Sequence, residues 1–175
     1  MGWGLMALLN ICIYPDNVLR QQAADVDKID GGIRRLIDDM AETMYEAPGI
    51  GLAANQVGKA LRLLLIDLQR PEEEHGLIVL VNPVLVTGRG ELVYEEGCLS
   101  LPGYFNKVKR FEEVLVRAQN QDGKLIEISA SGLLAVALQH EMDHLDGKLF
   151  IDRLGPIARD LFKRRWKKRM MQEAG

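Results

Sequence analysis

Residues 33–45 show the spacing of an amphipathic helix. Apolar side chains recur every three or four positions, with acids and arginines between them: Ile33, Leu36, Ile37, Met40 and Met44. Such a stripe turns one face of a helix toward a protein core. Pro48 and Gly49 follow the stripe and predict where the helix ends.

Short apolar runs predict strands in the middle of the chain. LRLLLIDL at 61–68 and LIVLVNP at 77–83 are short and apolar, with branched side chains that suit buried strands. Residues 112–120 and 124–130 flank Gln-Asp-Gly at 121–123, which is the signal of a β-hairpin.

Two further helices are predicted in the C-terminal third. Ser131 is placed to cap a helix that runs through LLAVALQHEMDHLD and ends at Gly147. Its first two turns are apolar on all sides, so we expect this helix to be buried. A last helix is predicted from Pro156 to about Met171. Because strands and helices do not alternate regularly, the pattern favours an α+β fold over a doubly wound sheet.

Composition agrees with an ordinary globular chain. Of 175 residues, 47% are apolar and 27% are charged. We therefore expect residues 1–175 to form a single domain. The net charge of −3 hides an uneven distribution, because residues 153–175 hold eight Lys or Arg against two acids, while the remainder holds 14 against 23. A basic end on an acidic body indicates a polyanionic contact for that end alone.

The N-terminal residues 1–15 are apolar but have no basic start and no clear small-residue cleavage site. The stretch is also too short to span a bilayer, so we expect a buried first strand rather than a signal peptide. Met6 offers an alternative start, which would make residues 1–5 an extension. Cys12 and Cys98 are too few for a disulfide framework, and a reducing cytoplasm is the expected compartment.

The candidate chemistry is concentrated in QHEMDHLDG at 139–147. His140 and His144 are four residues apart, which places both on one face of a helix, and Glu141 follows the first. HExxH is the pattern of zinc hydrolases, in which the glutamate is the general base. A catalytic metal usually takes three protein ligands and leaves one position for water, so a third ligand is needed. His75, in the charged run EEEHG, is expected to be a solvated loop residue.

Several residues compete for the place of the third ligand. In the metzincin pattern a third histidine would stand at position 150, where this chain has Phe150, which cannot bind a metal. A carboxylate ligand from the C-terminal region would be Asp160 or Glu173, but no supporting motif surrounds either. Cys12 lies in an apolar stretch expected to be a strand, where a buried structural thiol is the better interpretation.

Cys98 is the remaining candidate. It stands between a glycine and a polar turn in YEEGCLSLPG, a strand-end segment of the kind where binding residues gather. A thiolate with two imidazoles can bind Fe²⁺, Zn²⁺, Co²⁺ or Ni²⁺. The residues therefore predict a metal centre of Cys98, His140 and His144.

Three segments together resemble the signature motifs of the bacterial peptide deformylases. They are GIGLAANQ at 49–56, EGCLS at 96–100 with Glu95 before it, and QHEMDH at 139–144, in the family's order and approximate spacing. The likeness covers nearly the whole chain. It implies an enzyme that removes the N-formyl group from the initiator methionine of nascent polypeptides and releases formate. It also implies antiparallel β-sheets surrounding a central helix that carries HExxH, with a C-terminal helix.

The resemblance implies one divalent metal ion at the centre. Cys98, His140 and His144 would be its ligands and Glu141 the general base. Fe²⁺ would be the ion of the active form, with Zn²⁺, Ni²⁺ or Co²⁺ often in its place in preparations. Glu96 and Arg110 could form a supporting ion pair beside this centre, as the corresponding residues do in the family; an ordinary surface pair is the alternative.

The resemblance also implies how the substrate is held. Gln56 and the backbone N–H of Leu99 would donate hydrogen bonds to the oxyanion, and Gly51 would bond to the substrate backbone. The methionine side chain would enter an apolar pocket, for which the sequence offers without ranking Ile50, Leu138 or Leu101.

The last predicted helix is basic and amphipathic. Leu161, Phe162, Trp166 and Met170 are expected on one side, with cations around them. Packing of this stripe on the body would explain the apolar residues but not seven cations within residues 159–169. In deformylases with such a helix, the helix docks on the ribosome near the tunnel exit, and the resemblance implies the same for 156–171. A membrane surface is the alternative partner.

Two other functions compete with the deformylase interpretation. A zinc metallopeptidase would take a carboxylate in place of Cys98 as its third ligand. A catalytically silent paralogue that only binds the ribosome would have little need of Glu141, which the motif retains.

Overall fold

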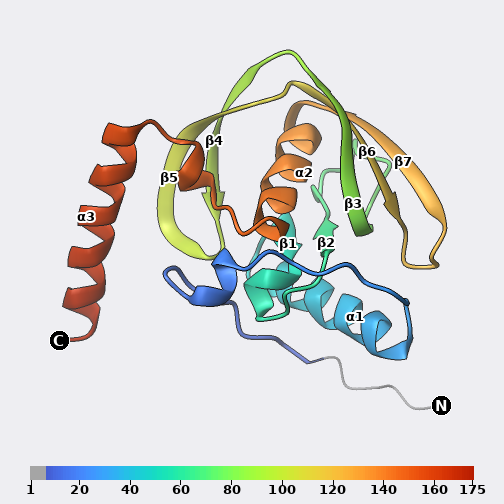
Figure 1. The fold of residues 1–175 in the computed structure, drawn as a ribbon, viewed down its shortest axis with the longest axis horizontal. Helices are drawn as coiled ribbons and strands as arrows, with labels where there is room; N and C mark the ends of the chain where they lie inside the picture. The colour runs from blue at the N-terminus through green and yellow to red at the C-terminus, as the bar shows by residue number, and fades with distance from the viewer. Residues whose placement is uncertain (1–6) are drawn as a thin grey trace.

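Helix α2 (Gly132–Leu145) lies at the centre of the molecule, between two antiparallel sheets (Figure 1). The computed structural model describes residues 7–175. Most of α2 is buried, because the apolar residues of its first turns pack on the larger sheet. The α+β fold around a central helix that carries HExxH is therefore confirmed.

The larger sheet has the strand order β1-β2-β3-β6-β7, and all neighbouring strands are antiparallel. Its strands are β1 (Gly51–Ala53), β2 (Leu63–Ile66), β3 (Ile78–Arg89), β6 (Glu113–Gln119) and β7 (Leu125–Ser131). The strands predicted at 61–68 and 77–83 and the hairpin around 121–123 are confirmed. Strand β1 was not predicted, because three small or apolar residues show no alternation; it lies at one edge of the sheet.

A separate two-stranded sheet consists of β4 (Leu92–Cys98) and β5 (Leu101–Arg110). Cys98 pairs with Leu101 across the turn, which leaves Leu99 and Ser100 as the two turn residues. The register shifts between Glu96 and Cys98. An irregularity of this kind bends a strand and changes the direction of the side chain that follows. Cys98 therefore stands at a strand end, as its sequence context predicts.

Helix α1 (Gly31–Glu46) packs on the larger sheet where β1 and β2 lie (Figure 1). Its buried residues Ile37, Met40 and Met44 pack with apolar residues of β1, β2 and β3. The side chain of Asp30 accepts a hydrogen bond from the backbone N–H of Ile33 (3.0 Å), which satisfies one free donor of the first turn. The predicted amphipathic helix is confirmed.

The two ends of α2 agree with the prediction, although its N-terminal cap does not. Ser131 is the N-cap residue, but its side chain makes no capping hydrogen bond. Gly147 has a φ of +70° and follows the C-cap. A Cβ at this position would lie 2.5 Å from the backbone oxygen of Arg20. Only glycine allows that conformation together with so close a contact.

The predicted buried first strand is wrong for the part of that segment that the structure describes. Residues 7–13 have no strand assignment, and Leu8 is 61% exposed. The backbone N–H groups of Leu9, Cys12 and Tyr14 donate to Thr43 Oγ1 (2.9 Å), the oxygen of Gln56 (2.7 Å) and the oxygen of Ser100 (2.9 Å). The segment is therefore held by scattered bonds to different elements rather than along a strand edge. The alternative start at Met6 lies outside the described residues.

Helix α3 (Pro156–Glu173) stands at one side of the molecule (Figure 1). Phe162 and Trp166 are buried, and Trp166 Nε1 donates to the backbone oxygen of Tyr14 (3.0 Å). Leu161 and Met170 are 45% and 37% exposed, so the apolar contact is narrower than predicted. Helix α2, with its HExxH motif, and the metal-binding candidates lie in the body of the protein, against which α3 packs. Within residues 7–175, no helix is both long and apolar enough to cross a bilayer.

Candidate metal centre and active-site groove

The structure brings Cys98, His140 and His144 together. Cys98 Sγ lies 3.3 Å from His144 Nε2, which in turn lies 3.3 Å from His140 Nε2. The possible ligand atoms of these three side chains all lie within 4.8 Å of one another. Within residues 7–175, no other group of three or more His, Cys, Asp or Glu side chains comes together in this way. Of the carboxylates considered from sequence, Asp160 is exposed on α3 and Glu173 pairs with Arg169.

The donor set fits a divalent transition metal. Two metal–nitrogen bonds of about 2.0–2.1 Å at a tetrahedral angle place their nitrogen atoms about 3.3–3.4 Å apart. The observed separation of the two Nε2 atoms is 3.3 Å. One sulfur and two imidazoles are ligands that iron, zinc, cobalt and nickel all accept. The histidine predicted to be a solvated loop residue, His75, is indeed exposed.

Burial and mutual contact shift the pKa values of the two histidines in opposite directions. Burial alone would lower the pKa of His140, but hydrogen bonds with Cys98 and Glu96 raise it well above the ordinary value. Burial and then the neighbouring His140 lower the pKa of His144 well below that value. A metal ion binds the deprotonated ring, so the ion and a proton compete most directly at His140.

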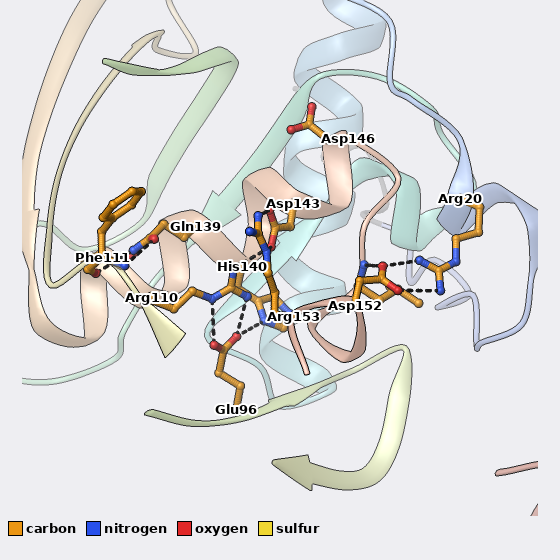
Figure 2. Close-up of polar contacts among 12 residues, drawn as sticks. Arg20, Glu96, Arg110, Phe111, Gln139, His140, Asp143, Asp146, Asp152 and Arg153 are labelled. Atoms are coloured by element: carbon orange, nitrogen blue, oxygen red, sulfur yellow. Dashed lines mark hydrogen bonds and ion pairs between the residues drawn. The ribbon is translucent and has the colours of Figure 1, made fainter. Parts of the chain in front are cut away.

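The expected ion pair between Glu96 and Arg110 is present, and it contacts the centre. Arg110 Nε donates to Glu96 Oε2 and Arg110 Nη2 to Glu96 Oε1, each at 2.9 Å. Glu96 Oε1 also lies 2.7 Å from His140 Nδ1. A carboxylate on the remote ring nitrogen fixes the orientation of a ligating imidazole, so this pair directs His140 Nε2 toward the centre (Figure 2).

Glu141 lies beside the centre, with its carboxylate against Gly51. A Cβ at Gly51 would be 2.6 Å from Glu141 Oε1, so the missing side chain makes room for this carboxylate. The other oxygen, Oε2, is buried without a hydrogen-bond partner among the described residues. Burial raises the pKa of Glu141 to about 7. Such a group can both accept and return a proton near neutral pH.

Gln56 and Leu99 flank the sulfur of Cys98. Gln56 is buried, and its Oε1 accepts from the Ala53 N–H at 3.0 Å. Its Nε2 lies 3.1 Å from Ser100 Oγ and 3.5 Å from Cys98 Sγ. The amide therefore faces the metal centre, and Gln56 is not a surface residue. Leu99 follows Cys98 in the turn between β4 and β5 and lines the adjoining groove.

A groove of about 750 Å³ passes the centre and is lined by residues of β1, the β4–β5 sheet and α2. Ile50 lines it and is 39% exposed. The expectation that Leu138 or Leu101 could line the pocket is wrong. Leu138 packs between α2 and the larger sheet, and Leu101 packs in the cluster that includes residues of α3.

The helix residues that do line the groove were missed from sequence. They are Leu133, Val136 and Ala137, which lie seven, four and three positions before His140. Residues at these offsets share a helix face with His140, whereas Leu138 points elsewhere. Helical spacing measured from the predicted ligand would have identified them.

Comparison with known proteins gives concordant results. A family model described as polypeptide deformylase matches residues 8–160, a range that includes Cys98, His140 and His144. The chain is 65% identical over 167 residues to the peptide deformylase of Syntrophobacter fumaroxidans, covering 95% of this chain and 98% of that protein. The crystal structure of a peptide deformylase from Legionella pneumophila matches with a TM-score of 0.87 at 46% identity, over 96% of this chain and 98% of that one. The crystal structure of a peptide deformylase from Synechococcus elongatus in complex with actinonin matches with a TM-score of 0.82 at 43% identity, over 87% of this chain and 84% of that one.

Proposed function

The chain belongs to the polypeptide deformylase family, and we propose that it works through a divalent ion bound by Cys98, His140 and His144. It is a peptide deformylase, a hydrolase that removes the N-formyl group from the initiator methionine of nascent polypeptides and releases formate. We assign this activity to residues 1–175 acting as one domain.

Fe²⁺ is the ion that we propose for the active form. The mixed sulfur and nitrogen donor set supports it, and the same set also accepts Zn²⁺, Ni²⁺ or Co²⁺. When bound, such an ion supplies Lewis acidity, which lowers the pKa of a water molecule toward neutrality and polarises the formyl carbonyl.

Glu141 is the proposed general base. It accepts a proton from the attacking water and delivers it to the nitrogen of the leaving amine. Its position on the helix, next to His140 but about 100° around the axis, turns it away from ligation and toward the groove. Its unpartnered Oε2 and a pKa near 7 support this assignment.

Gln56 and the backbone N–H of Leu99 are the proposed oxyanion donors. Attack on the formyl carbon places negative charge on the former carbonyl oxygen. Hydrogen bonds that strengthen on this oxygen are typically worth about 3 kcal/mol each in the transition state. The nearness of Gln56 Nε2 to Cys98 Sγ supports its part in this stabilisation.

Gly51 and Ile50 are proposed to contact the substrate. Strand β1, which begins at Gly51, lies at the edge of the larger sheet, and the edge of a sheet can pair with an extended peptide. Ile50 lines the groove together with apolar residues of α2, which suits a methionine side chain.

The observation that carries this assignment is the convergence of one sulfur and two imidazole nitrogens beside an unpartnered carboxylate. The test is anaerobic purification, metal analysis, and a formate-release assay on formyl-Met-Ala-Ser against its acetylated counterpart. We expect formate from the formylated peptide alone. Glu141→Gln should retain the metal and lose about 10²–10⁴-fold in turnover. Cleavage of internal peptide bonds would support a metallopeptidase, and inactivity of the metal-loaded protein would support a silent paralogue.

The exposed cations of α3 are proposed to bind the ribosome in the cytoplasm. Because Phe162 and Trp166 are buried, deleting α3 would uncover the body of the protein. Replacement of four exposed cations by glutamine is the cleaner test: Lys163, Arg164, Lys167 and Lys168. The matched control replaces four exposed lysines elsewhere: Lys28, Lys59, Lys107 and Lys124. Salt-sensitive ribosome pelleting should be lost only in the α3 variant, and equal pelleting of both variants would contradict docking. Binding to anionic vesicles but not to ribosomes would support a membrane surface instead.

A further inference from the structure

A row of alternating charges continues from the metal centre through the interior (Figure 2). Beyond Glu96, the buried Arg110 uses its third nitrogen, Nη1, to donate to Asp143 Oδ2 at 2.5 Å. Arg153 then donates to the same carboxylate from Nη2 (2.7 Å to Oδ1) and Nε (3.0 Å to Oδ2). The row therefore runs from His140 through Glu96, Arg110 and Asp143 to Arg153.

Burial makes the members of this row depend on one another. The side chains of Glu96, Arg110 and Asp143 are 4%, 2% and 8% exposed, whereas that of Arg153 is 45% exposed. Two carboxylates and two guanidinium groups balance in charge. If Arg153 is removed, the buried part keeps two anions and one cation, and Arg110 alone must satisfy both carboxylates.

Asp143 occupies a particular place in this row. It lies on α2 three residues after His140 and directly before His144, on the turn that bears both proposed imidazole ligands. Arg153 is the last residue of the 3₁₀ turn Phe150–Arg153, which leads into α3. Its two-nitrogen contact thus ties this turn of α2 to the segment that follows it.

We propose that Asp143 and Arg153 are positioning residues for the metal centre. Arg153 holds the Asp143 carboxylate, which holds Arg110 in the orientation that serves Glu96. Glu96 in turn fixes the ring of His140. The inference rests on the proposed ligand set, and it extends the support of the centre to a residue at the protein surface.

The outer end of the row is accessible without disturbing the groove. Arg110, Asp143 and Arg153 line a second cavity of about 350 Å³, and none of the residues lining it lines the active-site groove. A substitution at Arg153 therefore changes the row without touching the proposed substrate contacts.

Arg20 supplies a matched control. It is 39% exposed and pairs with Asp152, which lies on the same 3₁₀ turn as Arg153. Arg20 Nη1 and Nη2 lie 2.5 and 3.3 Å from the two oxygens of Asp152, so the pair is also bidentate. Among the described residues, neither Arg20 nor Asp152 makes a hydrogen bond or ion pair with Glu96, Arg110 or Asp143, and the charge of Arg20 acts only at a distance on His144. Loss of either arginine should loosen the turn, but only loss of Arg153 should reach His140.

The experiment compares metal release from Arg153→Met, Arg153→Lys and Arg20→Met. Each protein is loaded with Zn²⁺ or Co²⁺, the rate of metal transfer to an excess of chelator is measured, and the absorption spectrum of the Co²⁺ form is recorded. Substitution of residues that orient metal ligands typically costs 10–100-fold in affinity, so we expect about tenfold faster release from Arg153→Met and less than about twofold from Arg20→Met. The Co²⁺ spectrum should change only in the Arg153 variants. Arg153→Lys keeps the charge but loses the planar fork, and it should restore part of the slow release.

Equal release rates and unchanged Co²⁺ spectra in Arg153→Met and Arg20→Met, at similar thermal stability, would overturn the proposal. Asp143→Asn gives a second measurement from the buried side: in its background, Arg153→Met should add little further effect, and full additivity would also overturn the proposal. Should Asp143→Asn fail to fold, the half-exposed Arg153 still decides the question. Failure of the ligand set itself would be recognised separately, because Cys98→Ser would then retain its metal.

Discussion

Gly51→Ala is the substitution whose effect the structure defines most closely. A Cβ at this buried position would lie 2.6 Å from Glu141 Oε1 and 3.0 Å from both Glu141 Cδ and Cγ. The three nearest atoms thus all belong to the proposed base, and none belongs to a proposed metal ligand. Because φ at Gly51 is not positive, alanine does not strain the backbone, and the proposed base is the first group that the added methyl displaces.

The size of the effect follows from the displacement required. Ordinary contacts begin at 3.4 Å, so the carboxylate oxygen must retreat by roughly 0.8 Å from its 2.6 Å separation. A misplacement of about 1 Å at a catalytic group can cost about 100-fold in rate, which corresponds to about 2.7 kcal/mol. Overpacking should also lower the free energy of unfolding by about 1–3 kcal/mol, which leaves the protein folded.

The assay is formate release from formyl-Met-Ala-Ser with metal content measured on the same samples. We expect kcat to fall about 100-fold while the metal content remains that of the unmodified protein. Gly88→Ala is the control, because its Cβ would meet the ring of Phe111 at 2.4 Å, a comparable clash outside the groove. Phe111 is 43% exposed and can swing toward solvent, so kcat should be retained. A Gly51→Ala enzyme with near-normal kcat would refute the placement of the base against this glycine.

Three other predictions concern the metal and the base. Cys98→Ser should weaken metal binding by more than about tenfold, as measured by chelator competition, and normal binding would exclude the thiolate ligand. The base works only when deprotonated, so kcat/KM should rise with pH to a plateau. Burial raises the pKa of Glu141 to about 7 and a bound cation pulls it down, so an inflection well above 7 in the pH profile would contradict the assignment. The Fe²⁺-loaded enzyme should lose activity in air through oxidation of the iron and of Cys98, whereas the Zn²⁺-loaded enzyme should keep it; equal losses would point to the thiolate alone.

Periodicity predicted the elements that carry their own pattern. The sequence pattern extends over several turns or residue pairs in the helix at 33–45, in the hairpin around 121–123 and in the buried helix before Gly147. All three elements are present. The prediction of a strand in the N-terminal segment was wrong because apolar content alone does not indicate a pairing partner. The sequence placed Cys98 at a strand end but did not delimit β4 or predict β5, because these strands pair with each other outside the main sheet and leave much of their surface exposed.

The types of the proposed ligands follow from the sequence because chemistry constrains them locally. Two histidines four apart on a helix leave few choices for a third donor, and Phe150 removes one of these choices. The groove residues on α2 follow from the same helical spacing. No local pattern indicates that Gly51 makes room for Glu141, since the two residues are 90 positions apart and meet only across packed elements.

The amino-acid order by itself determined which groups this protein can use: a thiolate, two imidazoles on one helical face and a neighbouring carboxylate. Tertiary structure alone decided how firmly they are held. Cys98 reaches the histidines because the β4–β5 turn packs against α2, and His140 is oriented by a charge row that draws on β4, β5, α2 and the turn before α3. Contacts between distant segments depend on the packing of whole elements, and no short stretch of sequence encodes that packing.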